Sequence, residues 1–278
     1  MFHAPLKSLF SKLAFVLAPA LLAQSGPMPP PPLMLFVREE VKPGHGAAHA
    51  ATESAWTRAL VRGKSQDHYL GMSAMTGASE AWFIMGYASY ADWEAKQNEF
   101  DKNPALKGEI DKISAQDGEH LNGTRTWLGT LRKDLSYGPP VEIGKMRYMR
   151  VRTFRIKQGQ GRAFEEGVKM ALAAYEKSHY AASFAFYEVA AGTGSPTYLV
   201  LRPLKSLAEL DGMAAAEKAF QEALGEEGQK AMAKVFTDTV NAVENQLRAF
   251  SPKLSFPGPA VTASDPGFWT VKPPAAAK

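Results

Sequence analysis

The sequence contains no cysteine among its 278 residues. Disulfide bonds, thiolate nucleophiles and cysteine-ligated metal or iron–sulfur sites are therefore excluded, and so is a lipid anchor on an N-terminal cysteine. Stability must then come from the size of the hydrophobic core. A content of 45% hydrophobic and 22% charged residues is typical of a globular protein that can build such a core.

A strong excess of one charge is also missing. The formal net charge is +4, and Lys7 and Lys12 contribute two of these charges in a segment that we expect to be removed. The basic residues form no dense run, so the sequence does not predict binding to nucleic acid. Beyond Ala23, no stretch is long and apolar enough to span a bilayer, so we expect no membrane insertion once a signal is removed.

The N-terminal residues follow the pattern of a secretory signal. Lys7 and Lys12 precede an apolar run at 13–23, which has the length of a signal core and is too short for a membrane span. We therefore predict cleavage after Ala20 or Ala23 and a mature protein that is periplasmic or secreted. A membrane anchor or a buried helix is the alternative reading of the same residues.

Short motifs recur in the same order in the two halves of the chain. The pattern aliphatic-Lys-x-Gly-x-Gly occurs at 41–46 and again 115 residues later, at 156–161. Three further pairs of matching segments follow at similar offsets: 64–69 with 177–180, 89–93 with 206–210, and 135–137 with 254–256. Repetition at a nearly constant offset predicts two diverged copies of one structural unit.

Each copy shows the same order of periodic segments. Alternating residues at 33–41 and 146–157 predict strands, and a glycine turn and an amphipathic helix follow each of them. The apolar helix face is expected at Ala48, Ala55, Ala59 and Leu60 in the first copy and at Phe164, Val168, Ala171 and Tyr175 in the second. A hairpin, further helix and a last strand complete a βαββαβ unit. Ser89 and Ser206 are the expected N-caps of the later helices.

A four-stranded sheet with helices on one face leaves its other face uncovered. The two copies can cover each other, so we expect their sheets to face each other as a barrel within one chain. The predicted organisation is a signal peptide at 1–23, a proline-rich linker at 24–32, the first repeat at 33–137, a linker at 138–145, the second repeat at 146–256 and an irregular tail at 257–278.

The strand, the Lys-x-Gly-x-Gly turn, the helix, the hairpin and the Ser-x-Ala-Asp/Glu helix start resemble the ferredoxin-like dimeric α/β-barrel superfamily. Its NIPSNAP-type and antibiotic-monooxygenase-like members are the most similar, and the resemblance covers 33–256 in two copies. It implies an α+β fold of tandem ferredoxin-like repeats with antiparallel sheets. That superfamily includes cofactor-free oxygenases, haem-degrading enzymes and small isomerases, so the resemblance leaves the function open.

One predicted strand carries a candidate ligand site. Tyr148, Arg150 and Arg152 share a face of this strand, and they would line the space between the sheets if the opposite face took the helices. Buried arginines need partners, and Glu39 or Glu188 could serve. Such a cluster would suit an acidic or phenolic ligand. An open sheet end with solvated arginines is the alternative.

The histidines offer weaker signals. His68 and His179 each precede a tyrosine in the two copies, which indicates either a pair of site residues or a shared way to end a helix. His45 and His49 have the spacing of metal ligands, but no third ligand is identifiable. We therefore expect surface or helix-end histidines here and no metal site.

The sequence contains no Gly-x-Ser-x-Gly elbow, no phosphate loop and no complete dinucleotide fingerprint, and it identifies no catalytic residue. The favoured interpretation is an exported barrel that binds a small molecule without catalysis and without a cofactor. A cofactor-independent monooxygenase or isomerase acting on a small aromatic or hydrophobic molecule is the alternative. A haem-binding member of the superfamily is a third possibility, and the oligomeric state stays open.

Overall fold

Eight antiparallel strands close into one barrel in the computed structural model, which describes residues 26–194 and 196–271. The strands are β1 (Leu33–Val41), β2 (Leu70–Ala74), β3 (Glu80–Tyr87), β4 (Leu121–Leu131), β5 (Tyr148–Ile156), β6 (Ala185–Ala191), β7 (Thr197–Leu204) and β8 (Val240–Phe250). Their order around the barrel is β1-β3-β2-β8-β5-β7-β6-β4. The segment predicted as a signal peptide lies outside the described residues.

The two halves of the chain use the same strand order. The first half pairs as β4-β1-β3-β2 and the second as β8-β5-β7-β6, and β2–β8 and β4–β6 contacts join the two sheets edge to edge. The predicted α+β class and the antiparallel barrel within one chain are thus confirmed. Every strand edge has a partner in this arrangement, which removes the exposed edges that favour aggregation.

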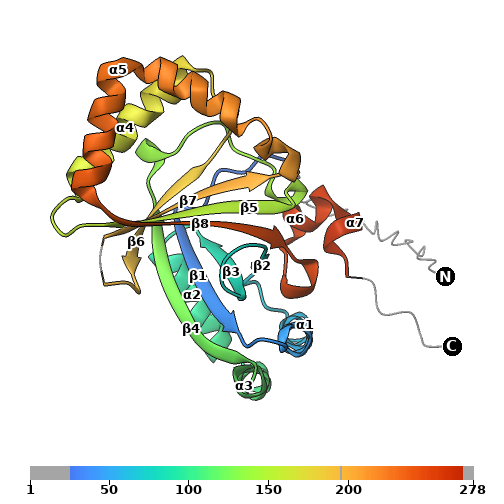
Figure 1. The fold of residues 1–278 in the computed structure, drawn as a ribbon. Coiled ribbons are helices and arrows are strands. Elements are labelled where there is room, and N and C mark those ends of the chain that lie inside the picture. Colours follow the sequence, from blue (N-terminus) through green and yellow to red (C-terminus); the bar gives the residue numbers. More distant parts are fainter. Residues whose placement is uncertain (1–25, 195, 272–278) are drawn as a thin grey trace, which may run out of the picture.

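Helices cover the outside of the barrel (Figure 1). They are α1 (Gly46–Arg62), α2 (Tyr90–Asp101), α3 (Pro104–Gly118), α4 (Gly161–Lys177) and α5 (Met213–Thr239). The first three pack on the sheet of β1 to β4, and α4 and α5 pack on the sheet of β5 to β8. Among the described residues, none of the helices combines the length and the apolar character that crossing a membrane requires.

The glycine and serine positions behave as their sequence context predicts. Gly44 and Gly159 follow β1 and β5 with φ of 83° and 77°, values that favour glycine because it has no Cβ. Ser206 forms a capping box with Glu209, and the Ser89 hydroxyl accepts a hydrogen bond from the Asp92 amide at 3.1 Å. These local signals fix where strands turn into helices.

Large side chains fill the barrel interior. Phe36, Met72, Trp82, Met149 and Tyr187 belong to one buried cluster with residues from every strand. Met149 and Val151 therefore point inward, and the other face of β5, with Tyr148, Arg150 and Arg152, turns towards the helices. The prediction that the arginine face lines the space between the sheets is wrong. Met149 and Val151 help to fill the interior, and the long arginines lie on the side where their charged ends can reach a cavity.

Buried arginines do occur inside the barrel, at other positions. Arg38 and Arg248 both pair with Glu80, at 2.9 and 2.7 Å, and the indole of Trp82 donates to the same carboxylate at 2.8 Å. The guanidinium carbon of Arg248 lies 4.1 Å from the Trp82 ring centre. These are not the arginines for which Glu39 or Glu188 was the expected partner: Glu188 pairs with Arg132 at 3.0 Å, and Glu80 is the acid that the two buried arginines share.

The described part of the predicted tail, residues 257–271, contains two short helices where an irregular segment was expected. They are α6 (Pro259–Ser264) and α7 (Pro266–Trp269). Trp269 is buried in the barrel cluster, and its indole donates to the carbonyl of Gly144 at 2.6 Å. This segment therefore docks on the body of the protein and contributes to the barrel core.

Candidate functional site

A cavity of about 430 Å³ lies between the outer face of the first sheet and helices α1, α2 and α3. This volume is in the usual range for a small-molecule site. Apolar and aromatic side chains make up much of its wall, including Leu35, Val37, Trp56, Phe83, Met85 and Phe100. Such a wall favours a small hydrophobic or aromatic molecule.

Five acidic residues line this cavity, and two of them, Glu39 and Glu53, lie close together. Glu39 projects from β1 on the same face as Leu35 and Val37, because alternate residues of a strand share a face. Glu53 projects from α1 one turn before Trp56 and only 6% of it is exposed. The cavity thus combines an apolar wall with two buried acids.

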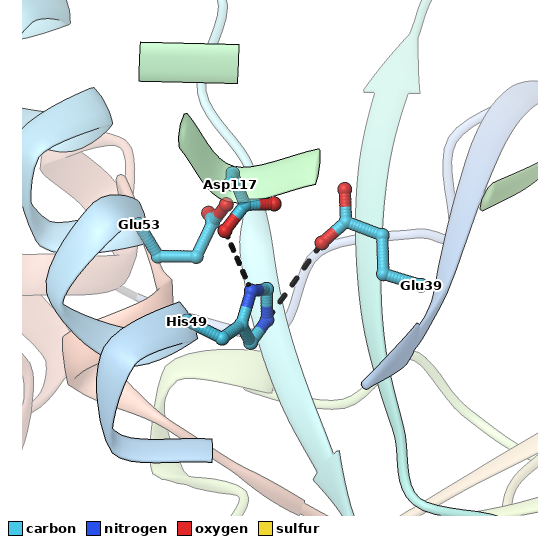
Figure 2. A group of neighbouring side chains, drawn as sticks. All are labelled: Glu39, His49, Glu53 and Asp117. Atoms are coloured by element: carbon cyan, nitrogen blue, oxygen red, sulfur yellow. Dashed lines mark hydrogen bonds and ion pairs between the residues drawn. The ribbon is translucent and has the colours of Figure 1, made fainter. Parts of the chain in front are cut away.

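Behind these acids lies a histidine–aspartate pair, shown in Figure 2. His49 from α1 and Asp117 from α3 are 3% and 5% exposed, and His49 Nδ1 lies 2.9 Å from Asp117 Oδ1. The Thr52 hydroxyl donates to the same oxygen. Burial opposes ionisation of Asp117, but the hydrogen bonds from His49 and Thr52 outweigh it and lower its pKa. An ionised Asp117 only accepts, so the proton of this pair is on His49 Nδ1.

The other ring nitrogen of His49 faces Glu39. Its Nε2 lies 3.7 Å from Glu39 Oε2, and neither atom has a hydrogen-bond partner within the described ranges. Burial and the charge of Asp117 raise the pKa of Glu39 from 4.5 to about 7, against the opposing effect of His49. Burial and the two neighbouring acids raise the pKa of Glu53 well above its usual range. The site therefore holds one acid that titrates near neutrality and a second acid whose pKa is also raised.

The four side chains Glu39, His49, Glu53 and Asp117 could also hold a divalent cation. One ligand atom from each lies within 4.8 Å of the others. Imidazole together with carboxylates suits first-row divalent metals, and the hydrogen bond from Nδ1 to Asp117 would orient the ring of such a ligand. A proton shared between His49 and Glu39 would also reduce the negative charge of the clustered carboxylates, without a metal ion.

A second cavity, of about 300 Å³, lies between the outer face of β5 and β7 and helices α4 and α5. Arg150, Arg152 and Arg202 line it together with several aromatic rings. Histidine is absent from the lining of both cavities, as far as the described residues show, so neither offers the imidazole ligand usual for haem. The residues present do not fit a histidine-ligated haem in these two cavities.

The six predicted site residues are not brought together. Glu39 belongs to the buried cluster, whereas Arg150 and Arg152 line the second cavity and Tyr148 lies at the start of the same strand. His68 packs against Phe256 with ring centres 4.5 Å apart, and His179 follows the end of α4 with φ of 52°. The structure therefore divides the predicted ligand site into separate places, and a binding role for these residues stays a prediction.

Glu53 and Asp117 were not predicted as site residues. His49 was expected to be a surface or helix-end histidine; it lies in the first turn of α1, next to His45 at the helix start, but is buried. The inward face of α1 carries His49, Glu53, Trp56 and Leu60, not Ala48, which is exposed. These positions lie 115 residues before the apolar series Phe164, Val168, Ala171 and Tyr175. His49 and Glu53 thus occupy positions that are apolar in the second copy, and this difference could have indicated a site. No such sequence signal exists for Asp117, which reaches the site through the packing of α3 on α1.

Comparisons with known proteins agree on the fold. No protein-family model and no curated protein matches the sequence. Several solved structures share the fold of this chain, although their sequences are only 9–10% identical to it. A protein provisionally assigned as a monooxygenase from Fusobacterium nucleatum is 10% identical, with a TM-score of 0.52 over 80% of this chain and 94% of its own.

Two further structures are similar to the same extent. An anthrone oxidase-like protein is 10% identical, with a TM-score of 0.52 over 79% of this chain and 91% of its own. A mutant chlorite dismutase from Candidatus Nitrospira defluvii is 9% identical, with a TM-score of 0.51 over 87% of this chain and 98% of its own. At these identities the likeness describes the fold, and the function must be argued from the site.

Proposed function

We propose that this protein is a cofactor-independent enzyme that removes a proton from a small aromatic or hydrophobic molecule bound in the first cavity. The observation that carries the proposal is Glu39, a half-buried carboxylate in the wall of an apolar cavity with a pKa of about 7. A general base works best when its pKa is close to the working pH. Proton removal is the first step of both a cofactor-independent oxygenation and an isomerisation.

The residues around Glu39 support this role. Glu39 takes the proton from an acidic C–H or O–H group of the substrate, and the His49–Asp117 pair stabilises the charge changes on the carboxylate. Tyr69 also lines the cavity, and burial raises the pKa of its hydroxyl, so it stays a hydrogen-bond donor. A donor of this kind can stabilise an oxyanion that forms on the substrate.

The fate of the substrate anion separates the two reactions. In an isomerase, Glu39 returns the proton to a different atom of the substrate. In an oxygenase, dissolved dioxygen is the oxidant: a methylene group and one O₂ give a ketone and one water, so atoms and electrons balance. The likeness to provisionally assigned monooxygenases and to an anthrone oxidase-like protein favours the oxygenase.

Anthrone is a suitable probe because its methylene protons are acidic and its body is aromatic. We expect the wild-type chain, dialysed against EDTA, to convert anthrone to anthraquinone with uptake of one O₂ per molecule. Glu39→Gln should lower the rate by about 100-fold or more, the usual scale for a general base. Glu99→Gln, at an exposed carboxylate on the rim of the same cavity, is the matched control.

Each other result has a distinct meaning. Binding of anthrone without turnover would support the non-catalytic binding barrel instead. Activity that disappears in EDTA and returns with one added metal ion per chain would replace the proposal by a metal-dependent enzyme. The absence of both binding and turnover would contradict the proposed substrate class.

The finer organisation of the chain is part of the same proposal. We infer that the two halves are diverged copies of one βαββαβ unit, supported by the four ordered motifs and the shared strand order. The likeness to NIPSNAP-type proteins is supported by the repeated turn motif alone. Export to the periplasm or the medium is supported by the charged and apolar N-terminal pattern, and N-terminal sequencing of the protein from its host would test it.

A further inference from the structure

The second cavity has the same position relative to its strand as the first but the opposite charge. Arg150, Arg152 and Phe154 are the third, fifth and seventh residues of β5 and line the second cavity. Leu35, Val37 and Glu39 are the third, fifth and seventh residues of β1 and line the first. Where the first cavity has Leu35 and Val37, the second therefore has two arginines, and where the first has Glu39, the second has Phe154.

The arginines of the second cavity gather without an acidic partner. Arg150 and Arg202 are direct cross-strand neighbours on β5 and β7. Like charges in directly opposite positions destabilise a sheet. Burial and the charges of Arg152 and Arg202 lower the pKa of Arg150, as expected for a guanidinium that lies close to two others. Repulsion between neighbouring arginines lowers stability, and such an arrangement is expected at a site that binds an anion.

Hydrogen bonding leaves much of their donor capacity unused. Arg150 contacts the sulfur of Met213 at 3.4 Å, Arg152 donates to Asn245 at 2.8 Å, and Arg202 donates to the Tyr180 hydroxyl at 2.8 Å. The Nε atom of Arg202 is buried without a partner in the part of the chain that is described. Each guanidinium has five donor hydrogens, so several remain free.

One carboxylate, Glu217 from α5, also lines this cavity. It is exposed, it accepts a hydrogen bond from Gln221 at 2.6 Å, and it forms no ion pair with these arginines in the described part of the chain. The remaining wall is rich in aromatic rings, namely Phe154, Phe164, Tyr175, Phe184, Phe186 and Phe220. The cavity thus offers an anion-binding end and an aromatic wall within about 300 Å³.

We propose that the second cavity binds a small aromatic carboxylate, with Arg150 and Arg202 on the carboxylate and the phenyl rings around the aromatic body. Arginine pairs with carboxylates through two parallel hydrogen bonds, which fits two guanidinium groups on adjacent strands. The site is separate from the Glu39 cluster and does not depend on the function proposed for that cluster.

Calorimetric titration of the full chain with 2-naphthoate tests this site. We expect 2-naphthoate to bind at least about 10-fold more tightly than the neutral 2-naphthylmethanol or inorganic phosphate. Arg150→Gln and Arg202→Gln should each weaken 2-naphthoate binding by about 10-fold or more, the scale of a charge-assisted hydrogen bond. Arg162→Gln, at an exposed arginine of α4, is the matched control.

Two further measurements distinguish a loss of binding at the second cavity from a loss of folding and from an effect at the first cavity. The thermal midpoint of Arg150→Gln should equal or exceed that of wild type, because the substitution relieves like-charge repulsion. Glu39→Gln should leave 2-naphthoate binding unchanged. Equal affinity for the acid and the alcohol, no binding by wild type, or unchanged binding in both arginine variants would each overturn the proposal.

Discussion

His49 Nε2 and Glu39 Oε2 face each other across 3.7 Å, and neither atom has another hydrogen-bond partner in the described residues. Asp117 fixes the opposite side of the imidazole ring through Nδ1. The ring therefore lies between an acid whose pKa is lowered and one that can gain or lose a proton near neutral pH. Burial, together with the charge of Asp117 and against the effect of His49, brings the pKa of Glu39 into the range that suits a general base.

The raised pKa of Glu39 predicts a pH-dependent cost in stability. Because its pKa is about 7 in the folded protein and 4.5 without these surroundings, the folded state holds the proton more tightly. Stability should therefore fall as the pH rises from 4.5 to 7, by on the order of 2–3 kcal/mol. Glu39→Gln removes this titration. The free energy of unfolding of the variant minus that of wild type should therefore be larger at pH 8 than at pH 4.5.

Urea denaturation at both pH values, with and without EDTA, measures this difference. Glu99→Gln, on the rim of the cavity, is the control and should show a much smaller pH-dependent change. A difference between Glu39→Gln and wild type that does not vary with pH would contradict the account. A difference that appears only after EDTA treatment would show that a bound cation keeps Glu39 ionised.

The Glu80 network inside the barrel predicts a large effect of a single substitution. Burial opposes ionisation of Glu80, but hydrogen bonds from Trp82 and Arg38 and the charges of Arg38 and Arg248 outweigh it and lower its pKa. Glu80→Gln leaves two buried arginines without an acid, which should cost about 3–5 kcal/mol. Denaturant unfolding against Glu94→Gln, at an exposed position of α2, measures the loss. A loss as small as that of the control would mean that water reaches the two arginines.

Trp269 should contribute to stability as a core residue although it lies near the end of the chain. It is 3% exposed, and its ring centre lies 6.1 Å from that of Phe250 in an edge-on contact. Trp269→Ala should lower the free energy of unfolding by about 3–5 kcal/mol. Val271→Ala, at a residue that is 51% exposed, should have an effect near zero in the same assay. Equal effects of the two variants would show that α7 does not close the barrel core.

Much of the fold could be predicted because its signals are local. Strand alternation, the glycines at 44 and 159 and the serine cap at 206 each act within a few residues, and all lie where they were expected. The face of β5 could not be predicted in this way. Both of its faces carry large residues, and only closure of the barrel decides which of them becomes the interior.

The site was harder to predict for a related reason. Glu39 stands in a strand, His49 and Glu53 in one helix and Asp117 in another, so no short motif contains them. Their proximity depends on how α1 and α3 pack on the sheet. The local hint was the pair of polar residues on the inward face of α1, where a core helix would carry apolar side chains.

Hydrogen–deuterium exchange of anthrone in D₂O without oxygen tests the central claim most directly. It follows the methylene protons by NMR and reports proton abstraction alone, because no oxidation can follow. The account predicts that the wild-type chain accelerates this exchange over buffer, that Glu39→Gln removes at least about 99% of the acceleration, and that Glu99→Gln retains it. Exchange no faster than in buffer, or acceleration that survives in Glu39→Gln, would contradict the assignment of Glu39 as the base.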